Sequence, residues 1–222
     1  MIEKPQDIHA MLSGRGLVAG LPVKAIQVRI LRDRWGSRIG PYTEVEFAAA
    51  CLPPEQPGEI VVSGEHVLPG YLNGHGDHET KFSVNGTIWH RTGDAGYLDP
   101  RGRLWLLGRC AARIDDAHGF IYPFAVEAAA SQYPLVRRSA LVAHRGRRIL
   151  AVQLDDRVSA ADLSALRESL AWAHTDEIQV HKRLPVDKRH NAKIDYSALD
   201  KLLHGGGGWG SRPQHDSPRI RR

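Results

Sequence analysis

Hydrophobic and polar residues alternate most clearly between positions 25 and 31, where Ile26, Val28 and Ile30 fall on one face. A period of two is typical of a half-buried strand. Further short strands are predicted at 59–63, 67–72, 87–90, 96–99 and 104–107, between turn signals such as the Asp-Pro-Arg-Gly sequence at 99–102. The segment 33–58 mixes glycine, proline and charge, which predicts a loop with a short strand near 44–47. Residues 16–109 are therefore predicted to form a mostly β unit.

The pattern changes after residue 109, where helical periods appear between short strands. Pro123 suits the start of a helix over 124–132, and Ser159 suits the N-cap of a second helix. In that second helix, Leu163, Leu166 and Leu170 share a face. Strands are predicted at 139–144, 149–154 and 177–181, the first two joined as a hairpin, and a last helix at 196–203. Residues 110–203 thus predict a small, mobile α+β domain and 204–222 a disordered basic tail, so that the fold class is α+β.

The composition is that of an ordinary globular protein, with 42% hydrophobic and 25% charged residues among 222. No apolar run reaches the length of a membrane span or of a signal peptide, and we therefore expect a cytoplasmic protein. The two cysteines, Cys51 and Cys110, lie far apart and have no metal-ligand spacing. The 12 histidines are interpreted as surface residues, none spaced as a ligand pair with a carboxylate, so no metal site is predicted.

The net charge of +5 raises the question of nucleic-acid binding. The tail after Leu203 carries four arginines and one aspartate, a net +3, which leaves +2 for the rest of the chain. A basic tail is usually solvated, and no nucleic-acid partner is expected.

Three segments carry the candidate chemistry, and they occur in a fixed order. The first is GEIVVSG at 58–64 with PGYL at 69–72, the second is WHRTGDAGY at 89–97 with GRLWLLGR at 102–109, and the third is LPVDKRHNAKID at 184–195. Each is weak alone, since a strand ending in glycine or a Thr-Gly-Asp turn is common. Together they resemble the adenylate-forming superfamily of acyl- and aryl-CoA synthetases and peptide-synthetase adenylation domains, over residues 15–203.

The resemblance implies roles for five residues. Lys193 matches the catalytic lysine, a cation that reaches both the carboxylate substrate and the α-phosphate of ATP. Asp94, with Thr92 in the same motif, matches the ribose ligand, and Arg109 matches a second ribose or phosphate contact. Gly119 matches a loop glycine that faces the active site once the small domain has rotated. ATP or AMP is the implied nucleotide, with Mg²⁺ implied but not held by these residues.

Within the superfamily, WHRTGDAGYLDPRGRLWLLGR, GFIYPFAVE and LPVDKRHNAKI are most similar to the β-lactone synthetases of bacterial long-chain olefin biosynthesis. Ordinary CoA ligases have Asp or Lys two residues after the arginine of the Gly-Arg motif, as a hinge. Here that position is Ala111, which agrees with the lactone-forming branch. Glu127 matches a helix carboxylate and is expected to be structural.

The family holds the triphosphate on a Ser/Thr/Gly-rich loop that ends in lysine, and the sequence has no such loop. Two hypotheses follow. The chain could be the C-terminal half of a ligase for a long-chain β-hydroxy or fatty acid that acts with a separate N-terminal half. Alternatively, it could be an inert remnant or interaction module that keeps the fold without the reaction.

Overall fold

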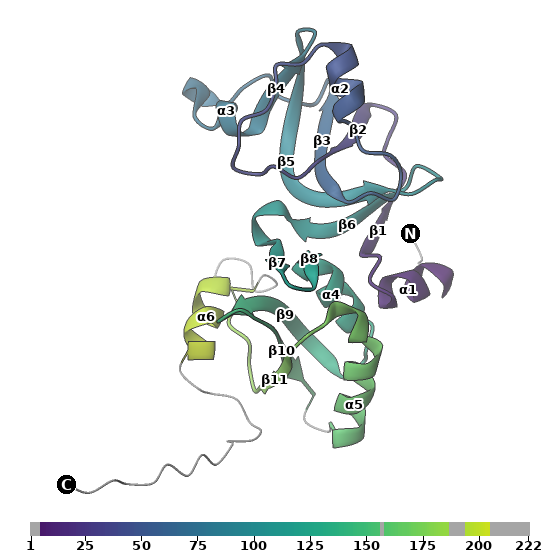
Figure 1. The fold of residues 1–222 in the computed structure, drawn as a ribbon, viewed down its shortest axis with the longest axis vertical. Helices are drawn as coiled ribbons and strands as arrows, with labels where there is room; N and C mark the ends of the chain where they lie inside the picture. The colour runs from purple at the N-terminus through teal and green to yellow at the C-terminus, as the bar shows by residue number, and fades with distance from the viewer. Residues whose placement is uncertain (1–4, 156–157, 187–193, 205–222) are drawn as a thin grey trace, which may run out of the picture.

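The protein is described here by a computed structural model, which covers residues 5–155, 158–186 and 194–204 (Figure 1). A six-stranded sheet forms the first half of the molecule and a three-stranded sheet the second, with a short hairpin at the junction between them. The predicted α+β fold class is confirmed, with most of the strands in the first half.

The first sheet is antiparallel throughout and has the order β1-β6-β5-β3-β2, with β4 beside the first part of β5. Its strands are β1 (Leu17–Gly20), β2 (Ile26–Leu31), β3 (Gly58–Gly64), β4 (Lys81–Val84), β5 (Thr87–Leu98) and β6 (Leu104–Arg109). The two strands predicted at 87–90 and 96–99 are parts of the single strand β5. This strand pairs first with β4 and then with β6, and it curves between them (Figure 1).

Several local predictions for this half are wrong. The segment at 44–47 begins a helix, α2 (Glu44–Ala50), because Thr43 and Glu46 form a reciprocal capping box. The predicted strand at 67–72 is absent, and the chain there enters η1 (Leu72–Gly74) and α3 (Asp77–Thr80). The first residues, for which the sequence predicts no element, form α1 (Pro5–Leu12).

Aromatic side chains make the core under α2. Phe47 from the helix packs against Phe82 of β4 and Trp89 of β5, with ring centroids 5.9 and 4.7 Å away. All three side chains are less than 10% exposed, as is Val61 of the neighbouring strand. Burial of such rings is the main favourable contribution to this part of the fold.

The helices and strands predicted for the second half are present, together with η2, a short hairpin and η3, which the sequence does not predict. After η2 (Cys110–Ala112) come the hairpin β7 (Ile114–Asp116) and β8 (Gly119–Ile121), and then α4 (Pro123–Ala130) with proline in its first turn. The hairpin β9 (Val136–His144) and β10 (Arg147–Leu154) is as predicted, and β11 (Glu177–His181) lies parallel to β10. The helices are α5 (Ala160–Ser169), η3 (Ala171–Ala173) and α6 (Tyr196–His204).

The three-stranded sheet is covered on both faces. On one side, Leu141, Leu150 and Val152 pack against α4 and α5, in a cluster that includes the fully buried Val126. The alternate positions Ala140 and Ala151 face the other way and pack, with Leu184, against Leu199 of α6. Small residues on this face let the last helix lie close to the sheet.

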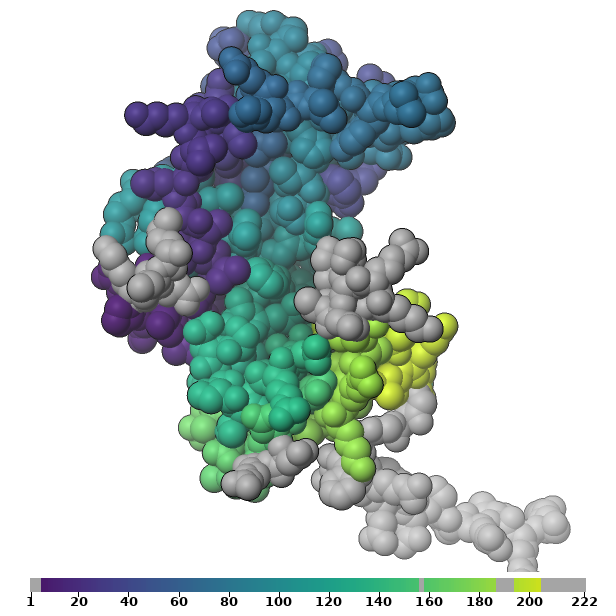
Figure 2. All heavy atoms as spheres, turned by 180° about the vertical axis from the view of Figure 1, so that it is seen from behind, coloured from purple at the N-terminus to yellow at the C-terminus, as the bar shows by residue number. Residues whose placement is uncertain are grey.

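The two halves share a buried cluster at their junction. Met11 of α1, Trp105 of β6 and Tyr122, which precedes α4, belong to it, and all are less than 6% exposed. Viewed from behind, the purple N-terminal residues lie against the green second half (Figure 2), in agreement with the packing of α1 on α4. Among the described helices, none is long and apolar enough to cross a membrane.

Asp99 closes the turn between β5 and β6 and supports a prediction. Burial alone would raise the pKa of this carboxyl, but hydrogen bonds from the backbone and side chain of Arg103, from Trp105 and from the Arg101 amide outweigh it and lower the pKa to about 2. A carboxyl with a depressed folded-state pKa contributes stability above its unfolded pKa and loses it as the pH falls. We therefore expect Asp99→Asn to lower the free energy of unfolding at pH 7 by about 2 kcal/mol.

Urea denaturation at several pH values measures this effect. The difference between the wild type and Asp99→Asn should shrink as the pH falls from about 4 towards and below about 2, because wild-type Asp99 becomes protonated over that range. Asp77→Asn, at the first residue of α3, is the control: this half-buried carboxylate accepts one backbone hydrogen bond, from the Tyr71 amide, and the difference should be smaller. A difference for Asp99→Asn that did not depend on pH would contradict the assignment.

Candidate functional site

The Thr-Gly-Asp motif forms a bulge in β5. Opposite it, β3 contributes the single residue Ile60, because Glu59 pairs with Ala95 and Val61 already pairs with Arg91. Three residues of β5 (92–94) therefore lie opposite one residue of β3, where a regular ladder would have one residue on each strand. Bulges bend a strand and redirect side chains, and here the bulge turns Asp94 outwards, to 40% side-chain exposure.

Thr92 and Gly93 fix the shape of this bulge. The Thr92 hydroxyl donates to the carbonyl of Ile60 at 2.8 Å and accepts from the Asp94 amide at 3.0 Å. Gly93 has φ +68°, and a Cβ there would lie 2.8 Å from the ring of Trp35. Glycine is required for both the left-handed backbone and the close approach of the indole.

Asp94 and Arg109 pair at the exposed edge of the bulge. They are opposite each other in the β5–β6 ladder, and Arg109 Nε lies 3.1 Å from Asp94 Oδ1. Arg109 also donates from Nη1 to the Thr92 carbonyl, at 3.4 Å. Burial raises the pKa of Asp94, and the charge of Arg109 opposes that shift. An ion pair this exposed contributes little to stability. Because both side chains are exposed, their donors and acceptors are accessible to a ligand.

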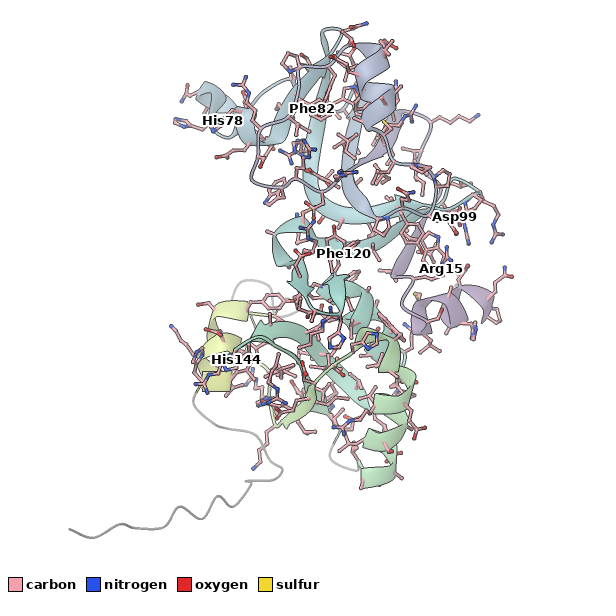
Figure 3. All side chains as sticks on the ribbon, in the orientation of Figure 1. Arg15, His78, Phe82, Asp99, Phe120 and His144 are labelled. Carbon is pink, nitrogen blue, oxygen red and sulfur yellow. The ribbon has the colours of Figure 1, made fainter. Side chains whose placement is uncertain are left out.

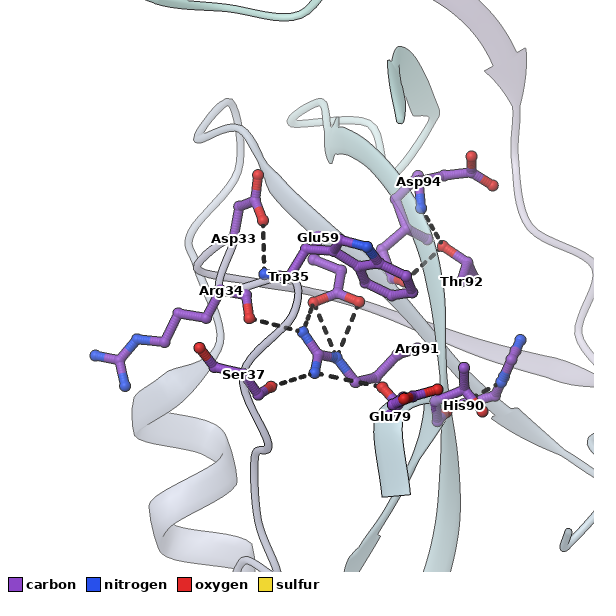
Figure 4. A network of polar contacts seen from close by, with 12 residues as sticks. Asp33, Arg34, Trp35, Ser37, Glu59, Glu79, His90, Arg91, Thr92 and Asp94 are labelled. Carbon is purple, nitrogen blue, oxygen red and sulfur yellow. Dashed lines mark hydrogen bonds and ion pairs between the residues drawn. The ribbon is translucent and has the colours of Figure 1, made fainter. Parts of the chain in front are cut away.

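A buried arginine holds the loop beside the motif (Figure 4). Arg91 forms a bidentate pair with Glu59, at 2.6–3.1 Å, and the two side chains are only 2% and 1% exposed. The same guanidinium donates to the carbonyls of Ser37 at 2.6 Å and Arg34 at 3.2 Å. It therefore ties the loop around residues 34–37 to the centre of the sheet and places Trp35 over Gly93.

The loop also reaches the start of the second half through Asp33. Its Oδ1 accepts from the Trp35 amide at 3.0 Å, while its Oδ2 accepts from the Tyr122 hydroxyl at 2.8 Å and from Arg113 Nη1 at 3.3 Å. Arg113 follows η2, and Tyr122 precedes α4. One loop thus contacts both the candidate site and the junction.

The structure brings together three of the five sequence-predicted site residues: Thr92, Asp94 and Arg109. Gly119 lies at the start of β8, where its backbone has φ +89° and its carbonyl accepts from Arg148 Nη2 at 2.7 Å. Within the described ranges, no recorded hydrogen bond or ion pair joins Gly119 to the other three. Lys193 lies outside the described residues, directly before Ile194, which pairs with Val186 in a β-bridge.

Sequence reasoning missed Trp35, because residues 33–58 are predicted to be mainly loop, and it also missed the Arg91–Glu59 pair, which joins two strands. A signal was present. Arg91 is two residues from Trp89 and Glu59 is two from Val61, so each charge shares a strand face with an apolar residue. A positive and a negative charge on the inward faces of two strands are a pattern typical of a buried pair. Glu127 accepts from the Leu141 amide and the Tyr196 hydroxyl, in keeping with the structural role expected of it.

The interpretation of the histidines as surface residues is wrong for two of them. His144 and His181 are only 9% and 4% exposed. Among the described residues, the one group of three or more metal-ligating side chains is His144, Asp200 and His204, and it is not beside Asp94. Mg²⁺ prefers oxygen ligands, so this group, with its two imidazoles, does not fit Mg²⁺.

The Asp94–Arg109 pair supports a prediction. Because Arg109 opposes the effect of burial, Arg109→Ala should raise the pKa of Asp94 further above its ordinary value. A ¹³C carboxyl NMR titration of Asp94 measures this shift directly. Arg101→Ala, in the turn at the far end of β5 and β6, is the matched control and should leave the titration unchanged. An unaltered Asp94 titration in Arg109→Ala would contradict the pairing.

Comparisons with known proteins show what the chain as a whole is similar to. No family model matches the chain. The olefin β-lactone synthetase of Xanthomonas campestris pv. campestris is 32% identical over 205 residues, which cover 84% of this chain and 36% of that protein. The 2-succinylbenzoate–CoA ligase of Bacillus subtilis is 35% identical over 118 residues, 53% of this chain and 21% of that protein. The chain spans about a third or less of the curated relatives it matches.

Solved structures extend the similarity to the fold. The O-succinylbenzoate coenzyme A synthetase of Bacillus subtilis, in complex with AMP, matches with a TM-score of 0.60 and 28% identity, over 77% of this chain and 33% of that one. The amide bond synthetase McbA of Marinactinospora thermotolerans matches with a TM-score of 0.65 over 84% of this chain and 36% of that one; at 24% identity it supports the fold alone. The chain is thus a homologue of olefin β-lactone synthetases and 2-succinylbenzoate–CoA ligases, with the fold of a C-terminal portion of an adenylate-forming ligase.

Proposed function

We propose that this chain supplies the ribose-binding edge and the catalytic lysine of an AMP-forming acid ligase. The observation that carries the proposal is the pairing of Asp94 with Arg109 on the bulge of β5. A carboxylate can accept hydrogen bonds from two adjacent hydroxyls, as the ribose of ATP or AMP presents them. In the described part of the chain, the recorded ion pair engages only Oδ1 of Asp94, so an acceptor oxygen remains for the ribose.

In the proposed reaction, a carboxylate oxygen attacks the α-phosphorus of ATP, and the bond between the α-phosphorus and the bridging oxygen to the β-phosphate breaks. The products are an acyl-adenylate and pyrophosphate. Both reactants are anions, and catalysis therefore needs cations placed where negative charge develops. Lys193 is assigned this role by the resemblance of its motif, and Arg109 contributes a second cation near the ribose. Mg²⁺ would arrive with ATP to offset the phosphate charge.

The substrate that we propose is a long-chain β-hydroxy or fatty acid. The support is the name of the relative that covers 84% of this chain, an olefin β-lactone synthetase, together with Ala111 after the Gly-Arg motif. Other relatives are named 2-succinylbenzoate–CoA ligases, which leaves CoA thiol and an internal hydroxyl as alternative acceptors.

We further propose that the reaction requires the rest of such a ligase, the two thirds that this sequence does not span, including a loop for the triphosphate. The support is the share of its relatives that the chain spans. The alternative is an inert module that keeps this fold without the reaction. Reconstitution with the remaining part of a ligase distinguishes an active ligase from an inert module.

The first test is pyrophosphate exchange with the N-terminal two thirds of a β-lactone synthetase supplied in trans. We expect negligible exchange by this chain alone, exchange when the two parts are combined, and loss of acyl-adenylate formation in Lys193→Ala by about 10²–10³-fold. Asp94→Ala should mainly weaken nucleotide binding, which raises the apparent KM for ATP.

The control is Lys201→Ala, an exposed lysine on α6 whose loss should leave the rate unchanged. Robust exchange by the chain alone would refute the need for those two thirds. If Lys193→Ala keeps more than about a third of the wild-type rate, the large electrostatic effect expected of a catalytic cation is absent. That outcome would favour the inert module.

We also propose that 16–109 and 110–203 are units that rotate about residues 109–113, where η2 is a short 3₁₀ turn containing Ala111. In this arrangement, the contact of Tyr122 with Asp33 opposes such rotation. Tyr122→Phe removes only the hydroxyl and should therefore increase tryptic cleavage after Arg109 or Arg113, followed by mass spectrometry. Tyr71→Phe, at an exposed tyrosine, is the control. Equal cleavage rates in the two variants would count against a hinge restrained by Asp33.

A further inference from the structure

Two histidines and an aspartate meet at the far end of the small sheet. His144 is the last residue of β9, while Asp200 and His204 are one turn apart on α6. Figure 3 places His144 beside α6 and away from Phe120, which marks the junction near the candidate nucleotide site. The cluster is therefore separate from Thr92, Asp94 and Arg109.

The three side chains are close enough to share one ion. His144 Nδ1 lies 3.6 Å from Asp200 Oδ1, and the ring centroids of His144 and His204 are 4.5 Å apart. One ligand atom from each residue can be chosen so that all lie within 4.8 Å of one another. Ligands at about 2.0–2.1 Å from a tetrahedral Zn²⁺ are roughly 3.3 Å apart, so small side-chain rotations suffice to close the site.

A hydrogen bond already orients one of the imidazoles. His204 Nδ1 lies 2.8 Å from the carbonyl oxygen of Asp200, and because a carbonyl only accepts, Nδ1 carries the proton. The lone pair is then on Nε2. A histidine that binds a metal through one nitrogen typically donates its other N–H to a carbonyl or carboxylate in this way.

The elements that carry the ligands are held firmly together. Leu199, next to Asp200, is fully buried against Ala140 and Ala151 of the sheet. His144 is only 9% exposed, whereas the side chains of Asp200 and His204 are 60% and 53% exposed. The cluster thus has a rigid inner ligand and two outer ligands that an ion can reach from solvent.

We propose that His144, Asp200 and His204 bind a divalent transition metal ion of the Zn²⁺ type. Two imidazoles and one carboxylate suit Zn²⁺ and related ions, whereas Mg²⁺ and Ca²⁺ prefer sets made of oxygen alone. Three protein ligands leave a fourth position for water, so the ion is exchangeable. Its effect is to fasten the last turn of α6 to the end of β9, and with it the helix that follows the Lys193 segment.

The sequence held part of this signal. Asp200 and His204 are four residues apart and share one face of a helix, a spacing that suits joint metal binding. The sequence-based statement that no histidine is spaced in this way with a carboxylate is therefore wrong for His204. The third ligand, His144, comes from a strand 56 positions before Asp200 along the chain, and only the fold brings it to the helix.

Calorimetric titration of the chelator-treated full chain with Zn²⁺ tests the site, and Co²⁺ absorption reports its coordination. We expect one tight equivalent with the d–d bands of a four-coordinate ion, and a higher Tm with Zn²⁺. Asp200→Asn and His204→Gln should each weaken that equivalent at least about tenfold, the loss already typical when a group supporting a metal ligand is removed. His66→Gln, at an exposed histidine in a distant turn, is the matched control.

The chain has 12 histidines, so weak binding elsewhere is expected and only the tight equivalent counts. His144→Gln should also remove it, and circular dichroism shows whether this buried substitution keeps the fold. If His144→Gln does not fold, the exposed Asp200→Asn and His204→Gln variants decide alone. Unchanged Zn²⁺ affinity in these two variants, or the absence of a tight equivalent in the wild type, would overturn the proposal and leave an acid–base cluster without a metal.

Discussion

The buried pair between Arg91 and Glu59 organises the first half of the molecule. A charged pair this deeply buried costs desolvation, and loss of one partner would leave an unpaired buried charge at a cost of about 3–5 kcal/mol. Arg91 offsets the desolvation cost because its remaining N–H groups donate hydrogen bonds to the carbonyls of Ser37 and Arg34. The loop of residues 34–37 therefore has one position relative to the sheet, and Trp35 in that loop covers Gly93.

The candidate site follows from this constraint. Trp35 leaves no room for a side chain at position 93, and the glycine there allows the left-handed turn that displaces β5 from its ladder. The displaced residues turn Asp94 towards solvent beside Arg109, so that a weak surface pair offers both donors and acceptors to a ligand. Arg91 of the buried network and Asp94 of the accessible pair lie three residues apart on β5, so the network holds the binding edge in place before a ligand arrives.

The same loop links the two halves. Asp33 contacts Trp35 on one side and Tyr122 and Arg113 on the other, so movement at the junction and the order of the loop depend on shared hydrogen bonds. At the opposite end of the small unit, α6 is fixed by Leu199, and the proposed ion would add a second attachment through Asp200 and His204. Both ends of the segment that includes Lys193 would then rest on well-packed elements.

The sequence by itself determined the α+β class and the elements after Pro123, because local signals such as the Ser159 cap and the 145–148 turn agree with the tertiary structure there. It also determined the Thr-Gly-Asp and Gly-Arg motifs and the family they resemble. Only the tertiary structure decided the pairing of Arg91 with Glu59, the place of Trp35 and the meeting of His144 with α6. These contacts join residues 32 to 60 positions apart, and neither periodicity nor local propensity carries information about which distant segments pack together.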